Sequence, residues 1–335
     1  MFDEQSQKMV VDNLKQQLRA RWKDMATDLR NLGNVSLRTY LDETGFELND
    51  VLKPGTNRGS WTQLRRAADI VHGTASDAEQ QLAKRTRVFA HVDDPLRHRV
   101  FVKLLGPEPV RYQDLTPVEQ TLARMLFFNV WPNGGEFSDY DQGFAILRDN
   151  DLIRNEISEI VDISFTDTRT ATVPLDQRFE SVPLRVHGRY NREEILSALG
   201  HASFDSLPNH FREGVKYFPD LNVDMLLVTL VKSDSGFSPT TMYRDYPISR
   251  SLFHWESQST TTLRSPTGQR YVNGTSNVLI FARTNKTDEL GARAYTFLGP
   301  ATYASHEGER PISIVWKLDH EMPAELFNEA KVAAG

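Results

Sequence analysis

Residues 223–231, VDMLLVTLV, form a continuous apolar run rich in branched side chains, and a series of similar short segments follows it. Turn residues separate these segments, which are 276–283 (SNVLIFAR), 293–299 (RAYTFLG), 301–307 (ATYASHE) and 311–318 (PISIVWKL). Apolar runs of this length between turns are typical of β-strands. Five or more short strands that close on themselves predict a small β-barrel with a flanking helix.

The first half of the chain has helical periodicity instead. Apolar residues recur every three or four positions from Met9 to Leu32, and Gly33 closes this predicted helix. Two further helices are expected within 139–165, and the starts of others carry capping residues: Ser36, Ser60, Ser76 with Glu79, Thr116 with Glu119, and Asn191 with Glu194. The sequence therefore predicts an α+β chain with an all-helical N-terminal domain.

Periodicity is lost in residues 167–183, which carry Pro174 and Pro183, so we predict a linker there. The predicted domains are a helical domain at 1–166 and a strand-rich domain at 184–335. We expect the strand-rich domain to stay folded when residues 1–166 are removed.

Composition sets limits on the class of protein. The 335 residues are 39% hydrophobic and 25% charged, and no apolar run has the length of a membrane helix, so we expect no membrane partner. The absence of cysteine excludes disulfides, thiolate nucleophiles and cysteine-ligated zinc. The acidic, polar N-terminus is unlike a secretory signal, and a cytoplasmic location is expected.

Charge is distributed unevenly along the chain. The net charge of −6 argues against non-specific coating of nucleic acid. Residues 244–283, however, carry five arginines and only two acids. We interpret Arg244, Arg250, Arg264 and Arg270 as contacts to DNA phosphates, although each alone is typical of a solvated loop arginine.

An aromatic cluster accompanies these arginines. Residues 237–269, FSPTTMYRDYPISRSLFHWESQSTTTLRSPTGQ, combine aromatic rings with hydroxyl and amide groups. Such a mixture is typical of a pocket that stacks on a flat polar ring and hydrogen-bonds its edge. The alternative is a core strand followed by a Ser/Thr-rich loop, and composition alone does not choose between the two.

Signatures of catalysis are missing from the sequence. It has no glycine-rich phosphate loop, no nuclease His-x-Lys pair and no zinc-binding His-Glu-x-x-His helix. The nearest constellation is His306, Glu307 and Glu309, which a turn between two strands explains equally well. We therefore expect no catalytic residues, no metal and no cofactor in this chain.

Several long motifs resemble a known family. Four segments carry the resemblance: 183–200 (PLRVHGRYNREEILSALG), 211–262 (beginning FREGVKYF), 265–273 (SPTGQRYVN) and 295–318 (YTFLGPATYASHEGERPISIVWKL). Residues 184–330 are similar throughout to the C-terminal region of large bacterial proteins that join a phospholipase-D-like nuclease to a superfamily-2 helicase. SWTQLRRAA (60–68) and HVDDPLR (91–97) resemble the helical region that follows the helicase in those proteins.

The resemblance implies a function in DNA recognition. Members of that family act in type IV, modification-dependent restriction, a form of anti-phage defence, and an SRA/PUA-like barrel flips and recognises 5-methylcytosine. This sequence lacks the nuclease and helicase, so we expect a DNA-binding module without enzymatic activity, either a part of a larger enzyme or a stand-alone reader. Its expected partners are duplex DNA with modified cytosine, helicase and nuclease domains of the same or an associated polypeptide, and a second copy of the chain.

Specific residues are predicted for the pocket. Tyr243, Tyr246 and Trp255 are the expected stacking rings, although strand alternation would place one or two rings of the cluster in the core, with Trp255 or Phe253 the first candidates. Asp245 is expected to accept a hydrogen bond from the cytosine amino group, with Ser257 and Gln258 in support.

Two other functions remain open from the sequence. The strand-rich domain could instead be an interaction scaffold that regulates a helicase without reading a base. It could also be a nucleotide or base hydrolase that uses His306 and Glu307. The helical part carries more acids than bases, so we expect it to couple to a neighbouring protein rather than to DNA.

Overall fold

The computed structural model describes residues 21–231 and 245–334. Residues 21–32 form a helix, and eight further helices follow before the sheet. These are α2 (Leu37–Thr44), α3 (Leu48–Leu52), α4 (Trp61–Ala67), α5 (Asp77–Ala83), α6 (Pro95–Leu104), α7 (Pro117–Val130), α8 (Tyr140–Arg148) and α9 (Asp151–Thr166). The predicted helical N-terminal region is confirmed.

Local capping explains where these helices begin. The side chains of Ser36, Ser60 and Ser76 each accept a hydrogen bond from a backbone N–H in the first turn. Thr116 and Glu119 form a reciprocal capping box at the start of α7, with Pro117 at the first helical position. Each of these residues satisfies backbone N–H groups that have no partner within the helix.

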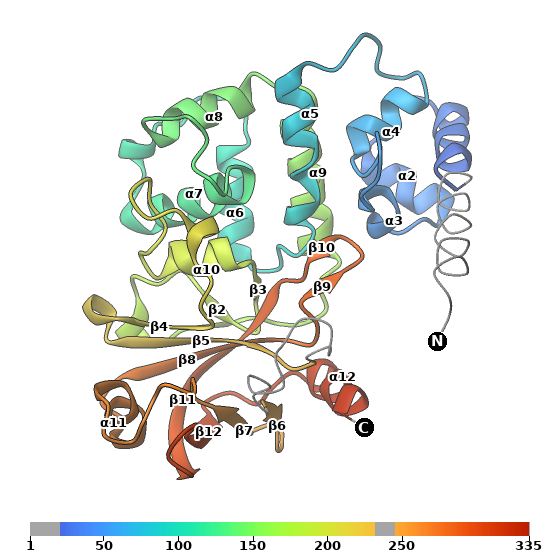
Figure 1. Ribbon diagram of the computed structural model, residues 1–335. Helices are drawn as coiled ribbons and strands as arrows, with labels where there is room; N and C mark the ends of the chain where they lie inside the picture. Colours follow the sequence, from blue (N-terminus) through green and yellow to red (C-terminus); the bar gives the residue numbers. More distant parts are fainter. Residues whose placement is uncertain (1–20, 232–244, 335) are drawn as a thin grey trace, which may run out of the picture.

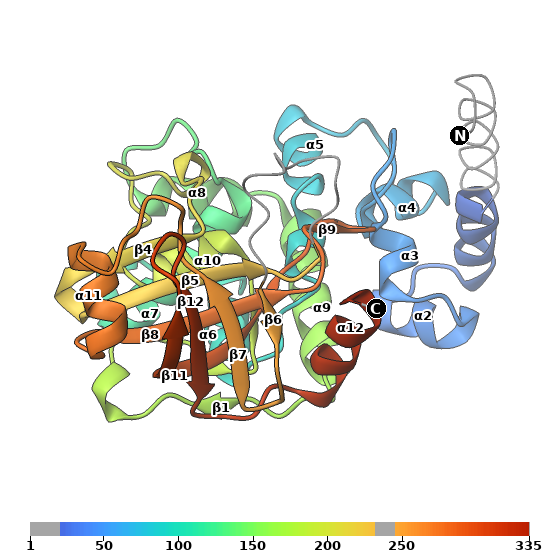
Figure 2. The ribbon, with the colours of Figure 1, turned by 60° about the horizontal axis from the view of Figure 1, so that its bottom comes forward.

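A mixed β-sheet follows the helices (Figure 2). Its order is β4-β5-β8-β11-β12-β7-β6, and β3 also pairs with β11. The strands are β3 (Arg189–Tyr190), β4 (Val215–Phe218), β5 (Val223–Thr229), β6 (Tyr246–Pro247), β7 (Leu252–Glu256), β8 (Asn277–Arg283), β11 (Tyr295–Glu307) and β12 (Ser313–Leu318). The pair of β5 with β8 is parallel, and the others are antiparallel.

Short strands and helices complete the second half. β1 (Val173–Pro174) pairs with β2 (Arg185–Val186), and β9 (Thr287–Asp288) forms a hairpin with β10 (Gly291–Ala292). The helices are α10 (Arg192–Ala198), α11 (Pro266–Asn273) and α12 (Ala324–Ala334). Within the described residues, no helix is both long and apolar enough to cross a membrane.

The sheet is open, so the predicted closed barrel is wrong. The outer strands β4 and β6 each have a single neighbour, and they do not pair with each other. The sheet instead curls along β11, whose register shifts between Phe297 and Gly299 and again between Tyr303 and Ser305. Such bulges bend a strand and increase its twist, which lets the two ends of the sheet approach without joining.

This curl produces two hydrophobic cores. One core lies inside the curl, where Val228 and Ile280 pack with residues of β7 and β12 such as Trp255 and Trp316. The other core lies on the helical face of the sheet, where Leu279 and other sheet residues pack with the helices in one continuous cluster. Successive residues of a strand point to opposite faces, which explains why β8 contributes to both cores.

Helices α6, α7 and α10 lie on this side of the sheet and share its core (Figure 1). Buried residues of α7, such as Leu126, belong to the same cluster as Phe281 and Phe297 of the sheet. The division at 167–183 stays a prediction. The continuous core does mean that the helices and the sheet bury each other's apolar surface.

Candidate ligand-binding cleft between the helices and the sheet

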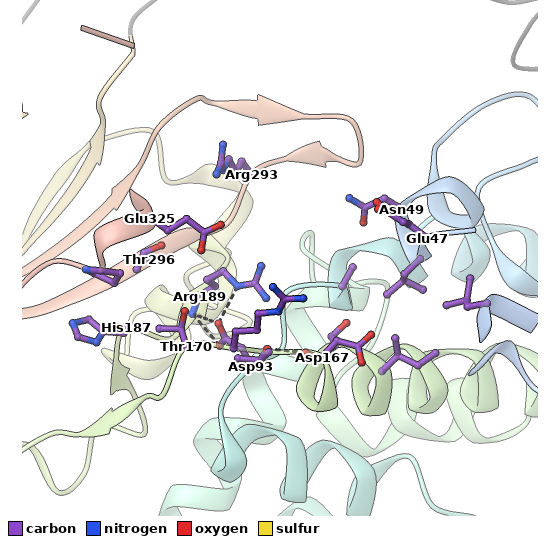
Figure 3. A pocket seen from close by; sticks show the side chains of 18 of the residues that line it. Glu47, Asn49, Asp93, Asp167, Thr170, His187, Arg189, Arg293, Thr296 and Glu325 are labelled. Atoms are coloured by element: carbon purple, nitrogen blue, oxygen red, sulfur yellow. Dashed lines mark hydrogen bonds and ion pairs between the residues drawn. The ribbon is translucent and has the colours of Figure 1, made fainter. Parts of the chain in front are cut away.

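A cleft with a volume of about 610 Å³ lies where the helical region meets the sheet (Figure 3). Its helical side carries Glu47, Asn49 and Asp167, and its sheet side carries Thr296 of β11 and Glu325 of α12. Cavities of this size accommodate small-molecule ligands in many proteins. The cleft is therefore the first place to examine for a binding site.

Asp93 and Arg189 meet at the floor of the cleft. The Asp93 carboxylate accepts hydrogen bonds from the Arg189 backbone N–H at 3.0 Å and from its Nε at 2.9 Å. Asp93 precedes α6, whereas Arg189 begins β3, so this pair joins the helical region to the sheet (Figure 3). The Arg189 side chain is nearly half exposed and reaches into the cleft.

Behind this pair lies a buried ion network centred on Arg97. The Arg97 guanidinium contacts Asp93 at 3.0 Å, Asp94 at 2.9 Å and Glu194 at 2.9 Å, and it lies over the Tyr190 ring. His91 adds a 2.6 Å contact to Glu194. The side chains of this network belong to α6, β3 and α10 or to the residues that precede α6. The network therefore connects these three elements.

The network changes the protonation behaviour of its members. Burial alone would raise the pKa of Glu194, but Arg97 and His91 outweigh it and lower that pKa to about 2. For Asp94, burial dominates and raises the pKa even though Arg97 opposes the change. Asp94 also accepts a hydrogen bond from the Arg97 backbone N–H, which makes it the N-cap of α6.

Other charges of the cleft are paired with a partner on the same side. Arg293 contacts Glu329 of α12 at 2.8 Å, and Arg38 contacts Asp167 at the end of α9 at 2.8 Å. His187 has a positive φ of 71°, and burial lowers its pKa. Among the described residues, no group of three His, Asp or Glu side chains is arranged to hold a metal ion. The cleft therefore presents paired charges suited to polar recognition.

The residues predicted for the base pocket lie elsewhere, at the β6–β7 edge and inside the curl. Tyr243 and Arg244 lie outside the described residues. Trp255 is 4% exposed and packs edge-to-face on Tyr271. It therefore occupies a core position, the alternative that the sequence analysis gave for this ring. Ser257 is buried, and its Oγ accepts a hydrogen bond from the Ile312 backbone N–H.

Two pocket residues remain together at the edge of the sheet. Tyr246 of β6 is 42% exposed, and its ring stacks on His254 of β7 with 4.6 Å between the ring centroids. The Asp245 carboxylate accepts a hydrogen bond from the Glu256 backbone N–H at 3.0 Å. Gln258 is exposed after the end of β7. Tyr246 and Asp245 therefore lie together at the sheet edge, and their role in binding a base stays a prediction.

The predicted phosphate-binding arginines fall into two groups. Arg264 is exposed and has no ion pair with any described residue. Arg270 forms two hydrogen bonds with the buried carboxylate of Asp224, at 3.0 and 3.1 Å, and lies over the Tyr217 ring. Arg250 donates to the Met322 carbonyl and contacts Glu321. Two of the arginines therefore hold the sheet and its C-terminal connection together.

The residues proposed for a hydrolase are separated by strand alternation. His306 and Glu307 are neighbours on β11, so their side chains point to opposite faces of the sheet. His306 instead contacts the Tyr303 hydroxyl at 2.6 Å.

The ion network was missed by the sequence analysis, although its residues lie in two of the quoted motifs. HVDDPLR contains His91, Asp93, Asp94 and Arg97, and PLRVHGRYNREEILSALG contains Arg189, Tyr190 and Glu194. The contacting residues of the two motifs are 96 to 103 positions apart, so no local pattern reveals their contact. The available signal was the spacing of Asp93 and Asp94 four and three residues before Arg97, beside apolar residues.

Comparison with known proteins gives one family match. Residues 184–330 match a family described as a domain of unknown function (DUF3427), which covers less than half of the chain. No curated protein matches the chain.

Proposed function

We propose that residues 184–330 form a DNA-binding specificity module that recognises modified cytosine in duplex DNA by base flipping. The supporting observation is the exposed ring of Tyr246 at the sheet edge, stacked on His254 and next to the fixed carboxylate of Asp245. An accessible aromatic ring beside a hydrogen-bond acceptor is the combination that binding of a flipped cytosine requires. The sequence resemblance of this region to modification-dependent restriction enzymes points to the same function.

Recognition by base flipping requires binding free energy that offsets the cost of flipping. Flipping a base costs a few kcal/mol of unpairing and unstacking, and stacking on aromatic side chains contributes about 1–3 kcal/mol per base. A cytosine methyl group adds only about 0.8 kcal/mol of apolar burial. Discrimination between methylated and unmodified DNA must therefore come mainly from the shape of the pocket.

The helical region has a separate role in this proposal. It couples the module to the helicase and nuclease domains of the same or an associated polypeptide. The contacts of Arg97 with Glu194 and of Asp93 with Arg189 support this role, because they would transmit displacement of α6 to α10 and β3. The exposed surface of the helical region would then be the surface that contacts the partner.

Binding curves on matched duplexes test the proposal. The probes are a duplex with one central 5-methylcytosine and the same duplex with cytosine, each titrated with wild-type protein and with Tyr246→Ala. We expect wild type to prefer the methylated duplex, and Tyr246→Ala to lose about tenfold in affinity for it, which corresponds to about 1.4 kcal/mol of lost stacking.

The control variant is Ile248→Ala. Ile248 is 47% exposed two residues after Tyr246, so its removal tests general loss of apolar surface without removing an aromatic ring. Equal affinity of wild type for the two duplexes would reject base recognition and favour the interaction scaffold. If Tyr246→Ala still prefers the methylated duplex with unchanged affinity, base recognition would stand but Tyr246 would not be the stacking residue.

A further inference from the structure

A second cavity of about 330 Å³ adjoins the cleft and has an unusual number of arginines. It lies between the 3₁₀-helix η1 (Thr86–Phe89) with its preceding residue, the β9–β10 hairpin, and the ends of β8 and β11. Five arginines and two carboxylates line this cavity: Arg85, Arg87, Arg189, Arg283 and Arg293, with Glu193 and Asp288.

Three of these arginines have no carboxylate partner. Arg189 and Arg293 are paired with Asp93 and Glu329, but Arg85, Arg87 and Arg283 form no ion pair with any described residue. Glu193 contacts Arg192 at 3.1 Å and opposes only part of the effect of burial on Arg85 and Arg283, and Asp288 is exposed.

The three side chains are held in place by neutral acceptors. Arg85 donates to the Asn129 carbonyl, Arg87 to the carbonyls of Leu290 and Lys84, and Arg283 to the Arg293 carbonyl and the Thr229 hydroxyl. Each guanidinium has five N–H donors and uses two in these bonds, so three remain. The nitrogens without a hydrogen bond, Nη1 of Arg85 and Nη2 of Arg87 and of Arg283, are not fully buried.

Burial of these charges carries a cost that an anion would remove. Burial lowers the pKa of Arg85, Arg87 and Arg283 below the usual value, in contrast to Arg38 and Arg270, whose carboxylate partners raise theirs. Buried charged groups are normally paired or hydrogen-bonded, and guanidinium groups match phosphate geometry particularly well.

We propose that this cavity binds a phosphate monoester group through Arg85, Arg87 and Arg283. The cavity is at the lower end of the size range of small-molecule sites, and Val88, Ala292 and Leu326 provide apolar surface beside the arginines. A nucleoside monophosphate has this combination of a dianion and a compact apolar part. The same group occurs at the 5′ end of a cleaved DNA strand, so free nucleotide and DNA end are its two sources.

Calorimetric titration with defined probes tests the site. The probes are deoxyadenosine 5′-monophosphate, deoxyadenosine, and one unmethylated oligonucleotide with either a 5′-phosphate or a 5′-hydroxyl. We expect saturable binding of a phosphorylated probe and none of its unphosphorylated partner. Arg87→Gln and Arg283→Gln should each weaken this binding about tenfold or more, since a hydrogen bond to a charged group contributes about 1.5–3 kcal/mol.

Arg99→Gln is the matched control. Arg99 is an exposed arginine on α6 that lines neither cavity, so its variant should bind like wild type. Circular dichroism would verify folding, and Arg87→Gln keeps the test informative if Arg283→Gln unfolds through loss of its contact with the Tyr295 ring. Binding of the mononucleotide alone would identify free nucleotide as the source, and binding of the phosphorylated oligonucleotide would identify the DNA end.

Two results would overturn the proposal. One is the absence of saturable binding of both phosphorylated probes to wild type. The other is unchanged affinity in both arginine variants. All probes lack methylcytosine, so these results are independent of base recognition at Tyr246.

Discussion

Arg97 and Glu194 form an ion pair that is fully buried, with 2.9 Å between Nη1 and Oε1, and the pair joins α6 to α10. The two residues are 97 positions apart in sequence. Two charges in such a position must satisfy each other, because removal of one leaves the other uncompensated in the interior. The contact is therefore the most sensitive point of the junction between helices and sheet.

Glu194→Gln should lower the free energy of unfolding by about 3–5 kcal/mol at pH 7, because Arg97 and His91 lose their shared carboxylate. The folded-state pKa of Glu194 is lowered from 4.5 to about 2, so its contribution is present above pH 4.5 and is lost as the pH falls toward 2. The difference between variant and wild type should therefore shrink below pH 4.5. Urea unfolding at several pH values measures this, with the exposed Glu136→Gln as control. A difference independent of pH would contradict the assignment.

Trp255→Ala should destabilise the fold rather than act on DNA recognition alone. Trp255 packs against Tyr271 and Trp316 in the core inside the curl, and removal of a buried Trp side chain costs about 3–5 kcal/mol. Thermal or urea unfolding would measure the loss. Wild-type stability in this variant would show that the ring is not a core residue.

Arg264 and Arg270 should respond differently to substitution by Gln. Arg264→Gln should weaken binding of the methylated and the unmethylated duplex alike. It should also reduce the slope of log K against log salt concentration by about one unit. Arg270→Gln should instead lower the free energy of unfolding, since it leaves the buried carboxylate of Asp224 without its arginine. Titrations at several salt concentrations, together with urea unfolding of both variants, separate the two effects. A loss confined to methylated DNA in Arg264→Gln would place that side chain at the base instead.

Removal of residues 1–166 should leave a poorly folded chain, contrary to the expectation from sequence. The truncation would remove the N-terminal helices that share one core with sheet residues such as Leu279 and Phe281, and would remove Arg97 from Glu194. Large exposed apolar surfaces promote association. Circular dichroism and size-exclusion chromatography of residues 167–335 would measure the outcome. A monomeric, cooperatively unfolding fragment would show that the sheet is an independent domain.

Local signals in the sequence predicted the local structure well. Ser36, Ser60 and Thr116 start helices because a side-chain oxygen and the backbone N–H groups it caps are close neighbours in sequence. The division of β11 into two strands was wrong for a related reason. Gly299 and Pro300 are typical turn residues, but Gly299 adopts a φ of 91° within a bulge and the strand continues.

Non-local features could not be predicted in the same way. Closure of the sheet depends on whether β4 and β6 meet, and no residue near either strand determines this. The cleft combines Asp93, Arg189 and Arg293 from distant segments, and only the fold brings them together. Alternation in β7 limited the aromatic prediction, because it sends Trp255 inward while His254 lies on the other face with Tyr246.

The long strand β11 has a mechanical consequence. Within residues 21–231 and 245–334, it is the one strand whose hydrogen bonds connect β4, β5 and β8 on the helical side to β12, β7 and the Tyr246-bearing strand β6. Its two bulges flank Ala301, where pairing changes from β8 to β12. A force applied to the outer strands, such as the pull of a bound duplex on the Tyr246 edge, would therefore reach the helical layer by two routes: along the backbone of β11 between its bulges, and through the core inside the curl, where Val228 and Ile280 pack with Trp255 and Trp316.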